Sequence, residues 1–186
     1  MAIVKMSDPS SVGVWKRAMP FPKNRYTLRC TDEASETSSA GNLMIHRTWE
    51  ICSPSPVQSV DGTKQLDIDG LKMEQYLPFR IFNDGELDEE RTPKVINTLR
   101  DDLALLGFEE DSFDDENPPL IAKGKVVDAI VYGKKNASFM EPTPEERAKG
   151  QKIGKPIKGP DGKDVVVYQL QIETILGLST TEVRPY

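Results

Sequence analysis

The chain has 186 residues, of which 37% are apolar and 29% are charged, and its formal net charge is −6 at pH 7. This length suits one domain of ordinary size with a buried core, and no apolar run approaches the roughly 20 residues of a membrane span. The N-terminus lacks the basic-then-apolar layout of a secretory signal, which predicts a cytoplasmic protein without a membrane anchor.

The two cysteines, Cys30 and Cys52, each lie in a predicted strand. Such residues are typically small buried apolar side chains in an intracellular protein, and a disulfide between them is the alternative.

Charge is distributed unevenly along the chain. The segment Asp84–Glu116 has a balance of −10, whereas Gly133–Lys163 has a balance of +4. Because binding of a polyanion depends on the local field at a groove, the negative total does not exclude a nucleic-acid partner. The acidic segment itself is expected to be solvated surface.

The first part of the chain predicts an arm, a strand and a loop. Residues 1–24 contain three prolines and no sustained periodicity, so we expect an irregular arm in which Trp15 lies beside two cations. Arg25–Cys30 alternates cleanly and predicts a strand with Tyr26, Leu28 and Cys30 inward. The polar segment Thr31–Asn42 ends in a Gly-Asn turn and is expected to join this strand to the next.

Two further strands follow around a Pro/Ser/Gly loop. Residues 43–52 predict the second strand, in which Arg47 shares a face with apolar residues, so either it lies near the open end of the strand or a bulge changes the phase. Residues 71–81 predict the third strand, with residues 65–70 as a short strand of their own or as its start. Its apolar residues recur at every second position, which leaves Lys72, Tyr76 and Arg80 on the opposite face. Pro78 marks an edge or a bulge, since it lacks an amide donor.

One helix is predicted after the turn at residues 83–85. Thr92 is a suitable N-cap, Pro93 suits the first helical position and Gly107 suits the stop. An apolar stripe at helical spacing faces the sheet, which leaves Asp101 and Asp102 outward; it comprises Val95, Ile96, Leu99, Leu103 and Leu106.

The last third predicts an acidic loop, two strands and a basic loop between them. Residues 123–132 are apolar on both faces and predict a strand covered on both sides. The basic loop 133–163 contains a short helix-like segment at residues 142–150. Residues 164–176 predict the final strand, and its inward residues are expected to be Val166, Tyr168, Leu170, Ile172 and Leu176.

This order of elements predicts a mainly β fold, a five-stranded OB-type Greek-key barrel with one α-helix between strands three and four and long loops. We expect an irregular arm over 1–24, a single OB-like domain over 25–178 and a short tail over 179–186. Barrels of this type bind single strands across strands two and three, beside the loop that joins strands four and five. That loop is the basic one in this chain.

The chain resembles small phage-encoded single-stranded-DNA-binding proteins in its layout from roughly Pro20 to Leu176. The resemblance lies in the runs 20–28, 39–45 and 49–51, in Leu106-Gly107 at the helix end and in Gly124 before a strand. It implies an OB-fold that coats displaced single strands during phage replication or recombination, in the cytoplasm of an infected bacterial host. Many single-strand binders end in an acidic tail, whereas the acidic cluster here, Glu109–Glu116, is internal; replication or recombination proteins would dock there.

The interface predicted for single-stranded DNA combines aromatic rings that stack on bases with cations that contact phosphates. The rings are Trp15, Trp49, Tyr76 and Phe139. The cations are Arg25, Arg29, Arg47, Lys72, Arg80, Lys134 and Lys135. For Trp15 and Trp49 a packing role in or over the core is the alternative. We predict no catalytic residue, no cofactor and no metal.

Two other classes of function stay open. One is a protein-binding or virion-structural β-module, with the acidic segment as docking surface and Phe113 as its anchor. The other is a metal-dependent nuclease, with Asp67, Asp69 and Glu74 as carboxylate ligands. A single histidine, His46, and two distant cysteines exclude most His-dependent and zinc sites, and His46 is expected to be structural or an incidental surface group.

Overall fold

The computed structural model describes residues 3–5, 22–60, 62–63, 65–110, 113–135, 145, 148–149 and 168–181. Contacts divide the chain into two compact units, one of residues 1–23, 55–68 and 132–171 and one of residues 24–54, 69–131 and 172–186. The arm, single domain and tail stay a prediction. The elements in chain order are β1 (Ile3–Lys5), β2 (Asn24–Thr37), β3 (Leu43–Ser53), β4 (Val57–Gln58), β5 (Gln65–Asp67), β6 (Lys72–Arg80), β7 (Phe82–Asn83), β8 (Glu86–Leu87), α1 (Arg91–Leu105), β9 (Val126–Lys135) and β10 (Tyr168–Leu178).

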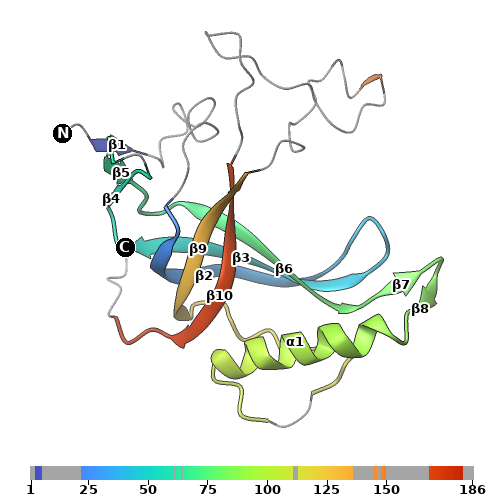
Figure 1. Cartoon of the computed structure of the whole chain (residues 1–186). Helices are drawn as coiled ribbons and strands as arrows, with labels where there is room; N and C mark the ends of the chain where they lie inside the picture. The colour runs from blue at the N-terminus through green and yellow to red at the C-terminus, as the bar shows by residue number, and fades with distance from the viewer. Residues whose placement is uncertain are drawn as a thin grey trace. The chain divides into compact units, whose positions relative to one another are not determined.

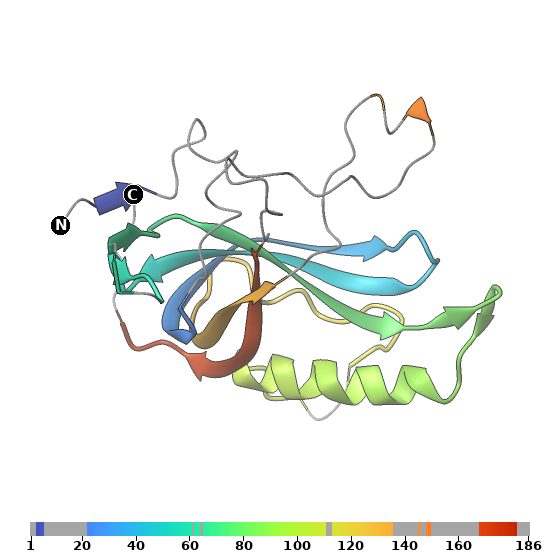
Figure 2. The same ribbon diagram turned by 45° about the horizontal axis from the view of Figure 1, so that its top comes forward.

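A curled antiparallel sheet of five strands forms a half-barrel in the order β10-β9-β2-β3-β6 (Figure 1). The prediction of a mainly β fold with one helix between the third and fourth long strands is confirmed. Figure 2 shows α1 running along one side of the sheet beside β6, the strand with which it is in contact.

Alternation along the strands decides which face of the sheet is buried. Tyr26, Leu28 and Cys30 of β2 are buried, as predicted, and they lie opposite buried residues of β3 and β9 in the strand register. On the same face, Ile45 of β3 and Phe79 of β6 form one core cluster with Leu99 and Leu103 of α1. The helix therefore packs on the inner face, and the opposite, outer face is not covered by it.

The helix begins two residues earlier than the sequence predicts, at Arg91 and not at Pro93. Glu90, not Thr92, is the N-cap residue, and its side chain makes no capping hydrogen bond. The Asp88 carboxylate instead accepts hydrogen bonds from the backbone N–H groups of Glu90 and Arg91. Thr92 is buried, and its hydroxyl accepts a hydrogen bond from the Ile81 N–H at 3.1 Å, which fixes the helix start to the end of β6. The stop at Gly107 is confirmed by its φ of +81°.

The predicted loop over residues 31–42 is mostly strand. β2 continues to Thr37, and the connection to β3 is a turn closed by a hydrogen bond from the Ser38 N–H to the Asn42 carbonyl at 2.8 Å. The prediction was wrong because the polar residues here alternate across a partly exposed strand and do not belong to a loop. Gly41 in this turn has a φ of +82°, which favours glycine.

The two edges of the sheet test two further expectations. Pro78 lies in β6, an edge strand whose register with β3 shifts between Leu43 and Met44, so both readings of this proline are confirmed. In β10, Ile175 is buried whereas Leu176 is exposed, contrary to the predicted phase. Two adjacent apolar residues fit either phase, so the alternation alone could not choose between them.

The smaller unit holds a three-stranded sheet in the order β1-β5-β4. Its β5 confirms that residues 65–70 contain a short strand of their own. The Ser55 hydroxyl donates a hydrogen bond to Asp67 at 2.7 Å and accepts one from the Ile68 N–H, which holds the start of this segment to its end. The predicted helix at residues 142–150 lies almost entirely outside the described residues.

Candidate nucleic-acid interface

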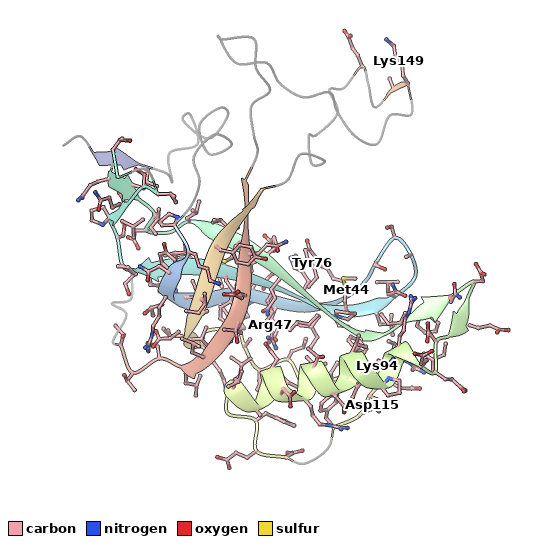
Figure 3. All side chains as sticks on the ribbon, viewed as in Figure 1. Met44, Arg47, Tyr76, Lys94, Asp115 and Lys149 are labelled. Carbon is pink, nitrogen blue, oxygen red and sulfur yellow. The ribbon has the colours of Figure 1, made fainter. Side chains whose placement is uncertain are left out.

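Three predicted contact residues alternate onto the outer face of β6, four positions apart along the strand. Alternation turns Lys72, Tyr76 and Arg80 away from the core, while Met73 and Phe79 are buried behind them. Tyr76 is 52% exposed. Figure 3 shows Tyr76 on the sheet, with Lys94 on α1 for comparison.

The ring of Tyr76 is stacked on His46 of the neighbouring strand β3. The ring centroids are 4.6 Å apart and the planes differ by 10°. The register explains this contact, because His46 and Tyr76 are direct partners across the β3–β6 pair. One face of the tyrosine ring is thus covered, and its exposed area belongs to the rest of the ring.

His46 is flanked by two carboxylates from the adjacent strands. Its Nδ1 lies 2.8 Å from Glu36 Oε1 of β2, and its Nε2 contacts Glu74 Oε2 of β6. The Thr48 hydroxyl donates a second hydrogen bond to Glu74 Oε2 at 3.0 Å. Partial burial alone would lower the pKa of His46, but the hydrogen bonds and charges of Glu36 and Glu74 together outweigh it and raise the pKa.

The arginines predicted to contact phosphates have carboxylate partners. Arg25 pairs with Asp128 at 2.5 Å, Arg29 with Glu50 at 3.0 Å and Arg80 with Glu116 at 2.8 Å. Glu116 is largely exposed, whereas Glu50 and Asp128 are mostly covered, so the Arg80 pair is the one most open to competition by a phosphate. Within the described part of the chain, no ion pair involves the exposed Lys72.

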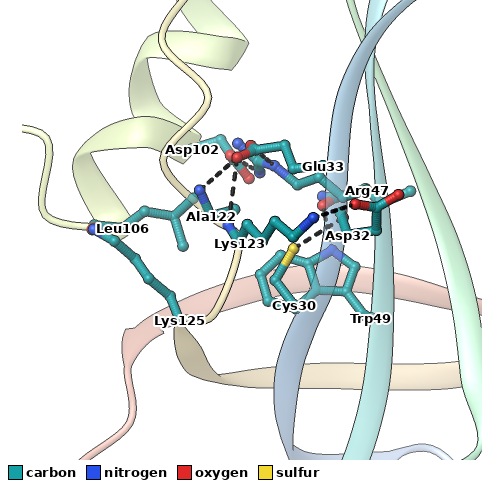
Figure 4. Close-up of polar contacts among 11 residues, drawn as sticks. Cys30, Asp32, Glu33, Arg47, Trp49, Asp102, Leu106, Ala122, Lys123 and Lys125 are labelled. Carbon is teal, nitrogen blue, oxygen red and sulfur yellow. Dashed lines mark hydrogen bonds and ion pairs between the residues drawn. The ribbon is translucent and has the colours of Figure 1, made fainter.

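Arg47 and Trp49 point to the inner face, so the prediction that they contact DNA was wrong. Both side chains are fully buried. Arg47 Nε donates to Glu33 at 2.8 Å and its Nη1 donates to Asp102, and the Trp49 indole donates to Gln75 at 2.8 Å (Figure 4). Asp102, expected to face outward, is instead the second carboxylate of this buried cluster.

Glu33 extends the buried cluster to the segment before β9. Its second oxygen accepts hydrogen bonds from the Ala122 N–H at 2.7 Å and the Lys123 N–H at 3.4 Å (Figure 4). Burial raises the pKa of Asp102, and the charge and hydrogen bond of Arg47 oppose that shift. The guanidinium is therefore explained as the internal counter-ion of two carboxylates, buried away from the outer face.

The structure does not describe the side chains of the other residues that were predicted to contact DNA. Trp15 and Phe139 lie outside the described residues, as do the side chains of Lys134 and Lys135 at the end of β9. Phe113, the expected anchor of the alternative docking surface, packs against the core cluster and lies edge-on to Phe108. It is half-buried and so is not an exposed anchor.

Sequence reasoning missed the contribution of His46, Glu36 and Glu74 to the outer face. The signal was present in part, since His46 and Tyr76 both alternate outward in their strands. Their contact depends on the register, which the sequence did not define.

No protein-family model matches the chain, and comparisons with curated proteins and with solved structures found no match either. Among the described residues, no helix is both long enough and apolar enough to cross a membrane. In the same part of the chain, no group of three or more His, Cys, Asp or Glu residues is placed to hold a metal ion.

Proposed function

We propose that this chain is an OB-type single-stranded-DNA-binding protein whose interface is the outer face of β3 and β6. One observation carries the proposal: the strand order sets β3 beside β6, and α1 covers only their inner face, so that Tyr76 and Lys72 are open to solvent. An exposed ring that shares a strand face with a cation is a combination that single-strand binders use.

The topology supports the OB assignment. If the long strands β2, β3, β6, β9 and β10 are numbered one to five, the fourth strand pairs with the first, and the spatial order is 5-4-1-2-3. The run 4-1-2-3 is that of a Greek key, and the helix follows the third strand, as it does in OB barrels. Such barrels bind oligonucleotides on the face of strands two and three, which are β3 and β6 here.

Each residue has a distinct part in the proposed binding. Tyr76 stacks on one base without sequence preference, and Lys72 contacts a phosphate. Arg80 exchanges Glu116 for a second phosphate, since an exposed ion pair contributes at most about 1 kcal/mol. Phage-type replication or recombination is the proposed setting, and partner proteins would dock on the acidic segment 109–116.

The test is a titration of fluorescently labelled oligo-dT, followed by anisotropy at two salt concentrations. Tyr76→Ala should weaken binding by about 5- to 150-fold, from the roughly 1–3 kcal/mol that a stacked base contributes. Lys72→Ala should reduce the slope of log K against log salt by about 0.7, the value for one phosphate contact on a single strand.

Lys94→Ala is the matched control, because it removes the same charge from an exposed residue of α1, on the other side of the sheet. Lys94→Ala should have the same affinity and the same salt slope as the wild type. Absence of oligo-dT binding at low salt, or an equal loss in Lys94→Ala, would contradict the proposal.

A further inference from the structure

We propose that His46 is the positioning residue of this interface and that loss of its proton weakens single-stranded-DNA binding. The inference rests on the proposed function and adds its regulation. It starts from the contacts of His46, since each ring nitrogen faces a carboxylate oxygen, one from Glu36 and one from Glu74.

Carboxylate oxygens only accept hydrogen bonds, whereas a neutral imidazole has one N–H donor and one lone pair. Both contacts are therefore satisfied together only when His46 carries two protons and a positive charge. The geometry demands the imidazolium, and the raised pKa of His46 agrees with it.

The groups that face His46 come from all the strands around it. Glu36 of β2 and Glu74 of β6 contact it directly, the more distant Asp32 of β2 also acts on its charge, and Tyr76 of β6 covers its ring. Asp32 is itself paired with Lys123 at 2.8 Å. The imidazolium is thus the cation that offsets Glu36 and Glu74 on the face where a polyanion would lie.

Loss of the proton has two consequences for binding. The outer face beside Tyr76 becomes more negative by one charge, and one ring nitrogen then presents its lone pair to a carboxylate. A unit charge about 7 Å from a phosphate in water changes the binding constant about threefold. Repulsion at the ring also loosens the support of Tyr76, so we expect a loss of about threefold or more.

The direction of the pH dependence follows from the raised pKa of His46. Below the ordinary histidine pKa of about 6.5, His46 is charged and binding is strongest. As pH rises through the raised pKa of the folded protein, affinity falls.

Two measurements on the full chain test the inference. His46 is the single histidine of the sequence, so its Hε1 resonance in an NMR titration reports its pKa without assignment of other histidines. Oligo-dT affinity is then measured by anisotropy from about pH 5.5 to 8.5 at fixed ionic strength. The wild type should lose affinity with a midpoint at the NMR pKa.

Two variants separate charge from structure. His46→Gln should bind weakly with a flat profile, and His46→Arg, which keeps the charge, should bind with a flat profile at the low-pH affinity of the wild type. A sloped profile in His46→Gln would assign the pH dependence to another group, such as the N-terminal amine, and overturn the inference.

The other outcomes are distinct. An NMR pKa at or below about 6.5 overturns the inference, because the carboxylates then do not hold the imidazolium. Wild-type affinity that stays constant through the measured pKa also overturns it, while the proposed function stands. If oligo-dT does not bind even at pH 5.5 and low salt, the proposed function fails, and the inference fails with it.

Discussion

Replacing Arg47 by Met removes the cation that pairs with Glu33 and Asp102 on the inner face of the sheet. Arg47 is fully buried, the Glu33 side chain is 1% exposed and the Asp102 side chain is 11% exposed. The variant therefore buries two carboxylates without their counter-ion. Breaking a buried ion pair by removing one partner costs about 3–5 kcal/mol.

Three features place the expected loss near the lower end of that range. Glu33 keeps its hydrogen bonds from the Ala122 and Lys123 N–H groups. Burial already raises the pKa of Asp102, so this carboxyl group takes up a proton more easily than an exposed aspartate does. Arg47 Nη2 has no hydrogen-bond partner among the described residues, so its removal also recovers a desolvation cost. We expect a loss of about 3 kcal/mol in the free energy of unfolding at pH 7.

The loss should depend on pH in a defined direction. Without Arg47 the pKa of Asp102 rises further, so the folded variant binds a proton at a pH where the unfolded chain does not. The variant is then stabilised relative to the wild type as pH falls toward the pKa of Asp102, and the difference between them narrows.

The assay is urea denaturation at about pH 7 and about pH 5, followed by circular dichroism and by tryptophan fluorescence. The triple variant Glu33→Gln/Arg47→Met/Asp102→Asn has no buried charge and should recover most of the lost stability. Arg91→Met serves as the surface control, since Arg91 is 73% exposed and 3.6 Å from Asp88, and should change stability by less than about 0.5 kcal/mol. A loss below about 1 kcal/mol in Arg47→Met, or a triple variant as unstable as the single one, would refute the reasoning.

Three further perturbations test other parts of the structure. Gly107→Ala should lower stability by about 1 kcal/mol, because φ is +81° and the new Cβ would lie 3.4 Å from Leu178 Cδ1; an unchanged urea midpoint would count against this C-cap. Leu103→Ala, at a fully buried position where α1 meets the sheet, should cost about 2–5 kcal/mol, and a value near that of the exposed Leu105→Ala would contradict the packing. Glu116→Gln should raise oligo-dT affinity by up to about fivefold by freeing Arg80, and an unchanged affinity would mean that Arg80 does not contact phosphate.

The sequence predicted the parts of the fold that depend on local periodicity. Alternation in β2 gave the inward set Tyr26, Leu28 and Cys30, and the helical stripe gave the buried residues Leu99 and Leu103. The same alternation predicted that Lys72 and Tyr76 share the outer face of β6. Each of these depends only on the direction in which neighbouring side chains point.

The parts that failed depend on partners from distant segments. The sequence did not explain the inward position of Arg47, because its counter-ions come from β2 and from α1. Asp102 was expected to face outward, because a carboxylate on a helix usually faces solvent. Trp49 matched both a stacking ring and a core residue, and only its burial against β6 decides between them. The sequence contains the residues of each cluster but not the register that joins them.

One register shift in β2 positions a carboxylate in each of two clusters: the buried one around Arg47 and the outer one around His46. Cys30 pairs with Trp49 and Asp32 pairs with Thr48, so Thr31 is passed over. A skipped residue reverses the phase of a strand, which is why Cys30 and Glu33, three positions apart, both face inward.

Because of this reversal, Glu33 lies opposite Arg47 inside the sheet, while Glu36 lies on the outer face beside His46. An uninterrupted strand would instead set Asp32 opposite Arg47 and Glu33 opposite His46, and would turn Glu36 inward, so the skipped residue decides which carboxylate serves each cluster. The stability of the inner face and the charge of the outer face therefore depend on the same backbone feature, and a change in the length of β2 near Thr31 would alter both together.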